Sequence, residues 1–224
     1  MNKKLFLAAV ASMAMLVTTT VASAEGNRWG LDRRYDSEIS AAEAFAATTH
    51  HQQQHLFKTK EKAKAVIIDV RTVEEHVGGH PPHSYSIPYP HLYNRQHSPA
   101  KGDYIPQSGE DFVAGVDALN LPKDTLIITM CRTGYRSVGA ANLLADAGYT
   151  NVRNMWHGFK GKLKTDVNGD EADLDGDGVV DGSPYSRDLD GWANFQGLPV
   201  SYDLQAKRLY APYLSLYYNV TGER

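Results

Sequence analysis

One cysteine, Cys131, is the side chain of this sequence that is best suited to covalent chemistry. It directly follows an apolar run at 126–130 and precedes an alanine-rich helical pattern that begins at Ser137. A thiol between the end of a strand and the start of a helix loses its proton more readily, because the helix N-terminus carries partial positive charge. The thiolate is the reactive form of cysteine. We therefore predict that Cys131 is a nucleophile rather than an inert core residue.

The five residues after Cys131 are suited to binding a negatively charged molecule. If the chain curls around the sulfur, backbone N–H groups of residues 132–136 converge and form an anion-binding nest. Gly134 allows the positive φ that such a curl often requires, and Arg132 and Arg136 add two permanent positive charges. This pattern predicts attack by a thiolate on an anionic substrate, followed by storage of an anionic intermediate. The candidate substrate-binding residues are Arg132, Thr133, Gly134, Tyr135 and Arg136.

The elements that must position this loop alternate along the chain. Continuous apolar runs at 65–70, 126–130 and 152–155 are typical of buried strands, and helical patterns at 111–121 and 137–147 lie between them. This order predicts an α/β fold with a central parallel sheet and helices on both faces. Such sheets bind ligands beyond the carboxyl ends of their strands, which is where Cys131 stands.

The segments around these elements give shorter patterns. Residues 25–37 are polar and predict a loosely held lead-in, after which Ser40 can cap a helix at 41–46. Residues 84–87 predict a short strand. The segment 92–111 is rich in proline, glycine and polar residues, so we predict a long loop there.

The first 24 residues have the layout of a secretory signal peptide. Lys3 and Lys4 precede an apolar stretch at 5–17, and Ala22-Ser23-Ala24 has the small residues of a cleavage site. The apolar stretch is short for a membrane span. We expect cleavage after Ala24 and export to the periplasm.

Composition excludes several classes of partner. A formal net charge of −3 argues against nucleic acid and against an anionic membrane surface.

A hydrophobic content of 42% supports an ordinary core. The 200 residues left by cleavage (224 minus 24) fit one domain with a small appendage. A single cysteine cannot form an internal disulfide, which favours a reactive free thiol or an intermolecular pairing.

Several separate motifs resemble the rhodanese family. They are Ile68-Asp69-Val70-Arg71, Glu74-Glu75-His76-Val77-Gly78-Gly79-His80, Ile87-Pro88, the loop Cys131-Arg132-Thr133-Gly134-Tyr135-Arg136-Ser137, Gly148-Tyr149-x-Asn151-Val152 and Gly158-Phe159. The resemblance extends from Ser40 to Gly161. The segments 191–194 and 197–199 are similar to the closing part of some rhodaneses, whereas Pro81, His83 and His157 depart from the family pattern.

The resemblance implies a rhodanese-like fold and a sulfurtransferase activity. Cys131 would take the outer sulfur of a donor such as thiosulfate, release sulfite and hold a persulfide until cyanide or a thiol removes it. Asp69 would brace the loop through Arg136, and Arg71 would pair with Glu75 in a structural contact. Arg132 directly after the cysteine resembles loops that favour thiosulfate over mercaptopyruvate.

Loop length separates two related chemistries. Cys131 and Arg136 enclose four residues, which gives the six-residue loop of the sulfurtransferases. The related phosphatases and arsenate reductases carry one residue more, for a tetrahedral oxyanion. The shorter loop suits a single sulfur atom and disfavours phosphatase activity.

An acidic segment follows the region of the resemblance. Residues 173–181 match the first nine positions of an EF-hand-type calcium loop, with glycine at the sixth position. The twelfth position, where a bidentate glutamate is expected, is Pro184. We predict a structural calcium loop, the alternative being a solvated acidic insertion. The candidate metal ligands are Asp173, Asp175, Asp177, the carbonyl of Val179, and Asp181.

These patterns divide the chain into five parts: a signal peptide at 1–24, a lead-in at 25–39, a rhodanese domain at 40–162, the acidic insertion at 163–190 and a closing segment at 191–224 that packs on the domain. The tract His50–His55 is interpreted as a solvated helix face rather than a metal site. Two further functions stay open. One is a periplasmic persulfide carrier or redox-binding module with little turnover on small acceptors, and the other is a non-catalytic, calcium-dependent interaction protein.

Overall fold

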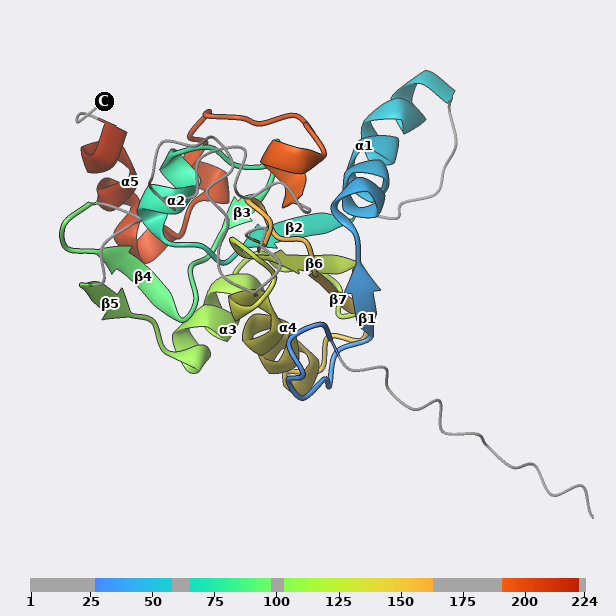
Figure 1. Cartoon of the computed structure of the whole chain (residues 1–224), viewed down its shortest axis with the longest axis horizontal. Coiled ribbons are helices and arrows are strands. Elements are labelled where there is room, and N and C mark those ends of the chain that lie inside the picture. The colour runs from blue at the N-terminus through green and yellow to red at the C-terminus, as the bar shows by residue number, and fades with distance from the viewer. Residues whose placement is uncertain (1–26, 58–64, 98–102, 163–190, 222–224) are drawn as a thin grey trace, which may run out of the picture.

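The computed structural model describes residues 27–57, 65–97, 103–162 and 191–221, with the side chains of 50–57 and 221 left out (Figure 1). Its main sheet has five parallel strands in the order β1-β7-β6-β2-β3. The strands are β1 Ser37–Ile39, β2 Val66–Asp69, β3 Tyr85–Ser86, β6 Ile127–Met130 and β7 Val152–Met155. The predicted parallel sheet is confirmed, and each of its three predicted apolar runs forms a strand.

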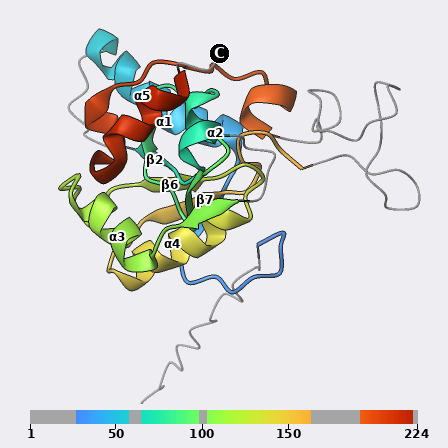
Figure 2. The same cartoon turned by 90° about the vertical axis from the view of Figure 1, so that its left-hand side faces the viewer.

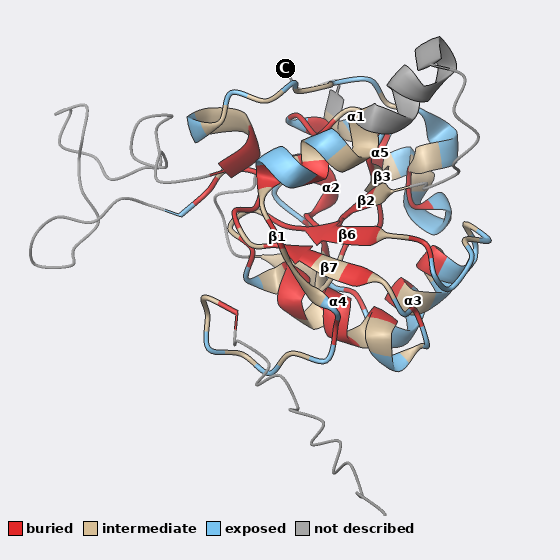
Figure 3. Cartoon of the chain, turned by 90° about the vertical axis from the view of Figure 1, so that its right-hand side faces the viewer, coloured by how far each residue is buried: buried red, intermediate tan, exposed pale blue. Residues whose placement is uncertain are grey.

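The central strands of this sheet are buried on both faces. Along β2, Ile67 packs into one core cluster and Ile68 into the other, and along β6 Ile128 and Ile127 divide in the same way. Alternation along a strand sends successive side chains to opposite faces, and Figure 3 shows β6 almost entirely buried. Continuous apolar runs are therefore explained by two covering layers.

Helices supply those layers on both faces, as predicted. Helices α3 (Gly109–Asp117) and α4 (Arg136–Asp146) pack on each other, and α4 contacts β6 and β7. Helix α1 (Ala41–Phe57) and the short π-helix η1 (Gly191–Phe195) cover the opposite face. Figure 2 shows α3 and α4 together on one side of the strands and α1 on the other.

The lead-in is more firmly held than the sequence predicted. Strand β1 pairs with β7 in parallel register, with Ser37 opposite Arg153. Tyr35 is buried in the main core cluster, and the Asn27 side chain accepts hydrogen bonds from the backbone of Trp29 and Leu31. The prediction of a loose segment was wrong because backbone pairing along an edge strand does not require an apolar sequence.

The segment predicted as a long loop contains regular structure. Strands β4 (His91–Asn94) and β5 (Tyr104–Pro106) form an antiparallel pair, and Leu92 and Asn94 are buried in alternation with their neighbours. Helix α3 then begins at Gly109, capped by Ser108, whose hydroxyl accepts the N–H of Asp111. The helix ends at Asp117 rather than near residue 121. The prediction of a loop was wrong because the proline and polar residues of this segment gave no strand signal, although it forms a short, half-buried hairpin.

The C-terminal segment packs on the domain. After the 3-10 turns Ala206–Arg208 and Ala211–Tyr213, helix α5 (Leu214–Thr221) contacts helix α2 (Val73–Val77). Tyr217 is fully buried there, and its hydroxyl shares a hydrogen bond with the hydroxyl of Ser86. This contact ties helix α5 to β3.

Three sequence predictions lie outside the described residues. They are the signal peptide, the calcium loop with its ligands at 173–181, and the side chains of the 50–55 tract, whose backbone belongs to α1. Among the residues that the structure does describe, none of the helices combines the length and apolar character needed to cross a membrane.

Candidate active site

Cys131 lies where the sequence predicted, at the carboxyl end of a central strand. It directly follows β6, and α4 begins five residues later at Arg136. The side chain is only 1% exposed, and the hydroxyl of Ser137 donates to its Sγ at 3.5 Å. Since the loop ends at the N-terminus of an eleven-residue helix, the sulfur sits near partial positive charge.

The loop after Cys131 is held by backbone bonds from the segment after β7. The N–H of Phe159 donates to the carbonyl of Cys131 at 2.8 Å. The N–H groups of Lys160 and Gly161 both donate to the carbonyl of Arg132, at 2.9 and 3.2 Å. Because these carbonyls are engaged behind the loop, the peptide groups there have a fixed orientation.

Two glycines make this close packing possible. Gly134 has a φ of +87°, as the sequence predicted, and a Cβ there would lie 2.3 Å from the carbonyl oxygen of Trp156. Gly158 has a φ of +67°, and its Cβ would lie 2.6 Å from the carbonyl of Arg132. Any larger residue at either position would therefore push the loop away from its support.

Arg136, the last residue of the loop, pairs with Glu75. Its two terminal nitrogens each lie 2.8 Å from a carboxylate oxygen of Glu75. Burial would raise the pKa of Glu75, but the charge of Arg136 brings it below its usual range. Burial alone would lower the pKa of Arg136, and Glu75 raises it above its usual value. The expected brace from Asp69 to Arg136 was wrong.

Asp69 instead pairs with Arg71. The Arg71 side chain donates to both carboxylate oxygens, at 2.9 and 2.6 Å, and also to the carbonyl of Gly79 at 2.8 Å. The Arg71 guanidinium lies 3.9 Å from the ring centroid of Phe159, which bonds the cysteine loop. The expected Arg71–Glu75 contact was thus wrong as well. The two arginines thus have each other's expected carboxylate partner. Asp69 also accepts the backbone N–H of Arg71, and this bond keeps Asp69 and Arg71 together.

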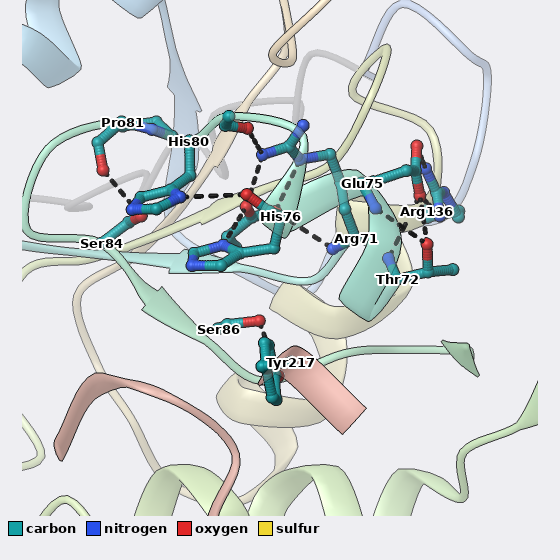
Figure 4. Close-up of polar contacts among 12 residues, drawn as sticks. Arg71, Thr72, Glu75, His76, His80, Pro81, Ser84, Ser86, Arg136 and Tyr217 are labelled. Carbon is teal, nitrogen blue, oxygen red and sulfur yellow. Dashed lines mark hydrogen bonds and ion pairs between the residues drawn. The ribbon is translucent and has the colours of Figure 1, made fainter. Parts of the chain in front are cut away.

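Two histidines that sequence reasoning did not assign complete this buried cluster. His76 Nδ1 lies 2.8 Å from Asp69 Oδ2, and its ring stacks on that of His80 with centroids 3.9 Å apart. Figure 4 shows Arg71 and His76 close together and Glu75 facing Arg136. Burial would raise the pKa of Asp69, but Arg71 and His76 hold it far below its usual range. Burial lowers the pKa of His80 to about 4.

A polar cavity of about 440 Å³ lies beside His76 and His80. No residue of the cysteine loop lines it. The sequence signal for these histidines was their spacing of one helical turn in the motif at 74–80. We used that motif only as part of the family resemblance and assigned the histidines no role.

Tyr135, a candidate substrate-binding residue, and His157, which departs from the family pattern, lie in different surroundings. Tyr135 is 52% exposed and meets the ring of Trp29 edge-on, with centroids 5.6 Å apart. His157 is buried, and its Nδ1 accepts the N–H of Ala41 at the start of α1. This bond gives His157 a packing role. Trp29 was not predicted, because only folding brings the lead-in to the loop.

The described residues contain no group of three or more histidine, cysteine, aspartate or glutamate side chains arranged to hold a metal ion. The predicted calcium ligands are not part of that search, since they lie outside these residues.

The fold and the site define a class of protein. A five-stranded parallel α/β sheet carries a single cysteine in a six-residue loop between a strand end and a helix. Arg136 of this loop pairs with Glu75, and Arg71 at the end of β2 pairs with Asp69. Residues 52–164 match the family described as the rhodanese-like domain. The chain therefore belongs to the rhodanese-like family.

Individual relatives are distant. An uncharacterized protein of Rickettsia prowazekii, RP600, is 35% identical over 97 residues, which cover 43% of this chain and 71% of that protein. Thiosulfate sulfurtransferase 18 of Arabidopsis thaliana is 30% identical over 92 residues, covering 41% of this chain and 62% of that protein. Among solved structures, Rv0390 from M. tuberculosis is 23% identical with a TM-score of 0.46, covering 75% of this chain and 99% of that one.

Proposed function

We propose that this protein is a sulfurtransferase that moves a sulfane sulfur from an anionic donor, such as thiosulfate, through a persulfide on Cys131 to a thiol or cyanide acceptor. The observation that carries the proposal is the position of Cys131 at the end of β6, in a six-residue loop that leads into α4. A relative named as a thiosulfate sulfurtransferase supports the same chemistry.

The transfer has two balanced steps. The Cys131 thiolate attacks the outer sulfur of thiosulfate, an S–S bond forms to the enzyme, and the bond to the sulfonate sulfur breaks to release sulfite. An acceptor thiolate or cyanide then takes the outer sulfur, and the Cys131 thiolate returns. The Ser137 hydroxyl and the α4 N-terminus stabilise negative charge on sulfur in both states.

Mass spectrometry of the intact protein tests this proposal. After incubation with thiosulfate and removal of the reagent, we expect one added sulfur atom on the wild-type chain and sulfite in solution. Cys131→Ser should show neither. If the wild-type protein gains no sulfur and releases no sulfite, the proposed activity is wrong.

A persulfide carrier is the second candidate, because the Cys131 side chain is only 1% exposed. Such burial slows attack by free acceptors on a loaded cysteine. A carrier forms the persulfide but turns over slowly with cyanide or small thiols, and delivers sulfur to one protein partner. Steady-state turnover with cyanide separates the two: many turnovers per minute support the enzyme, and a single loading event supports the carrier.

We also propose a structural calcium ion at 173–181, held by Asp173, Asp175, Asp177, Asp181 and the carbonyl of Val179. The alternating carboxylates and the turn glycine in the sequence support this site. Calorimetric titration with calcium should show one binding event that Asp173→Asn with Asp177→Asn removes. The same variant shows whether calcium changes sulfur transfer.

The first 24 residues support export, so we propose a periplasmic location. Expression of the whole chain in a Gram-negative host should give a mature protein that begins at Glu25 in the periplasmic fraction. Recovery of the uncleaved chain from the cytoplasm would contradict this location.

A further inference from the structure

The positive charge at the end of the cysteine loop is already balanced. Arg136 places both terminal nitrogens on the two oxygens of Glu75, in a planar two-bond contact. The side chains are 18% and 9% exposed, so water screens the contact only weakly. Arg136 closes the loop that begins at Cys131, and its neighbour Ser137 donates its hydroxyl hydrogen bond to the Cys131 sulfur.

Glu75 is fixed in place by its own helix. It is the third residue of α2, and its Oε2 accepts the N–H of Thr72 at 3.1 Å while the Thr72 hydroxyl accepts the N–H of Glu75 at 3.4 Å. This capping box is formed by glutamate or glutamine. A donor entering the loop therefore cannot draw Arg136 toward itself unless it displaces a carboxylate with several other bonds.

The other arginines near Cys131 do not replace the positive charge of Arg136 that Glu75 neutralises. The charge of Arg71 is neutralised as well, because Arg71 is paired with Asp69. The two pairs leave Arg132 as the loop's remaining cation, and the Cys131 thiolate offsets it. Near the outer pair, burial lowers the pKa of His91, and the charge of Arg136 lowers it further, which disfavours a positive charge on this imidazole.

We propose that Glu75 is a specificity-determining residue that withholds the charge of Arg136 from the sulfur donor. The site then favours a donor with one negative charge, such as an organic persulfide or thiosulfonate, over a donor with two. The reason is that the electrostatic interaction energy between the site and the donor is proportional to the charge of the donor. This inference rests on the sulfurtransferase function and names the donor class for it.

Methanethiosulfonate and thiosulfate are matched probes for donor charge. Both present a terminal sulfur on a tetrahedral sulfonyl sulfur, but the first has a methyl group where the second has a charged oxygen. With methanethiosulfonate, the Cys131 thiolate takes the terminal sulfur and methanesulfinate leaves. With thiosulfate, the same S–S bond forms and sulfite leaves. Each step transfers one sulfur atom and conserves charge.

The experiment compares the rate of Cys131 persulfide formation with these two donors in the wild type, Glu75→Gln and Glu75→Asp. Glutamine keeps the capping box and the shape of the side chain but removes its charge. We expect Glu75→Gln to accelerate thiosulfate about tenfold and methanethiosulfonate about threefold, because removal of one negative charge acts twice on a dianion. Glu75→Asp keeps the net charge and should change the ratio of the two rates less than Glu75→Gln does.

A purely structural role for Glu75 predicts another result. Loss of loop geometry would slow both donors by the same factor in Glu75→Gln, and an unchanged ratio of rates overturns the inference. Salt dependence of the wild type gives a second test that needs no variant. We expect a shallow decrease of the thiosulfate rate with salt, whereas a steep decrease would show that Arg136 attracts the donor. Failure of both donors to modify wild-type Cys131 would instead contradict the sulfurtransferase function itself.

Discussion

Two arginine–carboxylate pairs flank the cysteine loop and differ in burial. The inner pair, Asp69–Arg71, has side chains 0% and 2% exposed and further contacts to His76 and Gly79. The outer pair, Glu75–Arg136, is 9% and 18% exposed and includes the last residue of the loop. A fully buried pair mainly stabilises the fold, because removal of one partner leaves the other charge buried without a counter-charge. We propose that a pair at the loop itself also sets the charge that a sulfur donor meets.

Breaking the inner pair should give the largest effect on stability. Asp69→Asn leaves the Arg71 guanidinium buried without its counter-charge, and we expect a loss of about 3–5 kcal/mol in the free energy of unfolding. Urea denaturation measures it. The matched control is Asp103→Asn at the exposed Arg95–Asp103 pair, where a change within about 0.5 kcal/mol is expected. Equal losses at both positions would remove the distinction based on burial.

The backbone support behind the loop should be the next most sensitive. Gly158→Ala places a methyl group against the Arg132 carbonyl in a left-handed conformation, and we expect a loss of about 3 kcal/mol together with slower persulfide formation. Gly148→Ala is the control, since its φ is +87° but nothing lies within 4 Å of the added Cβ. Its cost should be about 1 kcal/mol, without a change of rate. Thermal melting measures the loss of stability and the mass assay the rate of persulfide formation. Together they separate the backbone strain that both variants share from the steric clash that only Gly158→Ala introduces.

Weakening the outer pair should change activity more than stability. Arg136→Lys keeps the charge but loses the two-bond contact with Glu75, and we expect a loss of about 1 kcal/mol. The mobile ammonium is then free to approach the donor, so the ratio of thiosulfate to methanethiosulfonate rates should rise. A loss of stability as large as that of Asp69→Asn would show that both pairs serve the fold alike.

Acid should destabilise the protein through both pairs. The folded pKa values of Asp69 and Glu75 lie below their unfolded values of about 4. Their contribution to stability is therefore complete above that range and is lost as the pH falls through the folded values. Melting temperature should decline steeply below about pH 4, and less steeply in Asp69→Asn. Parallel curves for the two proteins would contradict the assignment of Asp69.

The sequence was sufficient for the sheet and for the position of the cysteine. Apolar runs and a glycine that needs positive φ are local signals, and Cys131 and Gly134 follow from them. It did not reveal which arginine meets which carboxylate. That choice depends on how α2 and the end of β2 are oriented in three dimensions, and spacing along the chain does not encode it.

Contacts between distant segments were missed for a similar reason. Strand β1 and the Trp29–Tyr135 contact arise only when the lead-in reaches β7 and the loop. The hairpin of β4 and β5 has too few apolar residues to stand out from a loop. His76 was treated as part of a motif, although its bond to Asp69 is one of the most buried polar contacts of the site.

The most direct test is the mass of the wild-type protein after exposure to thiosulfate and, separately, to methanethiosulfonate. We predict a single added sulfur atom that a reducing thiol removes and that is absent in Cys131→Ser. An unmodified wild-type mass after both donors, measured on folded protein with its thiol reduced, would contradict sulfur transfer through Cys131.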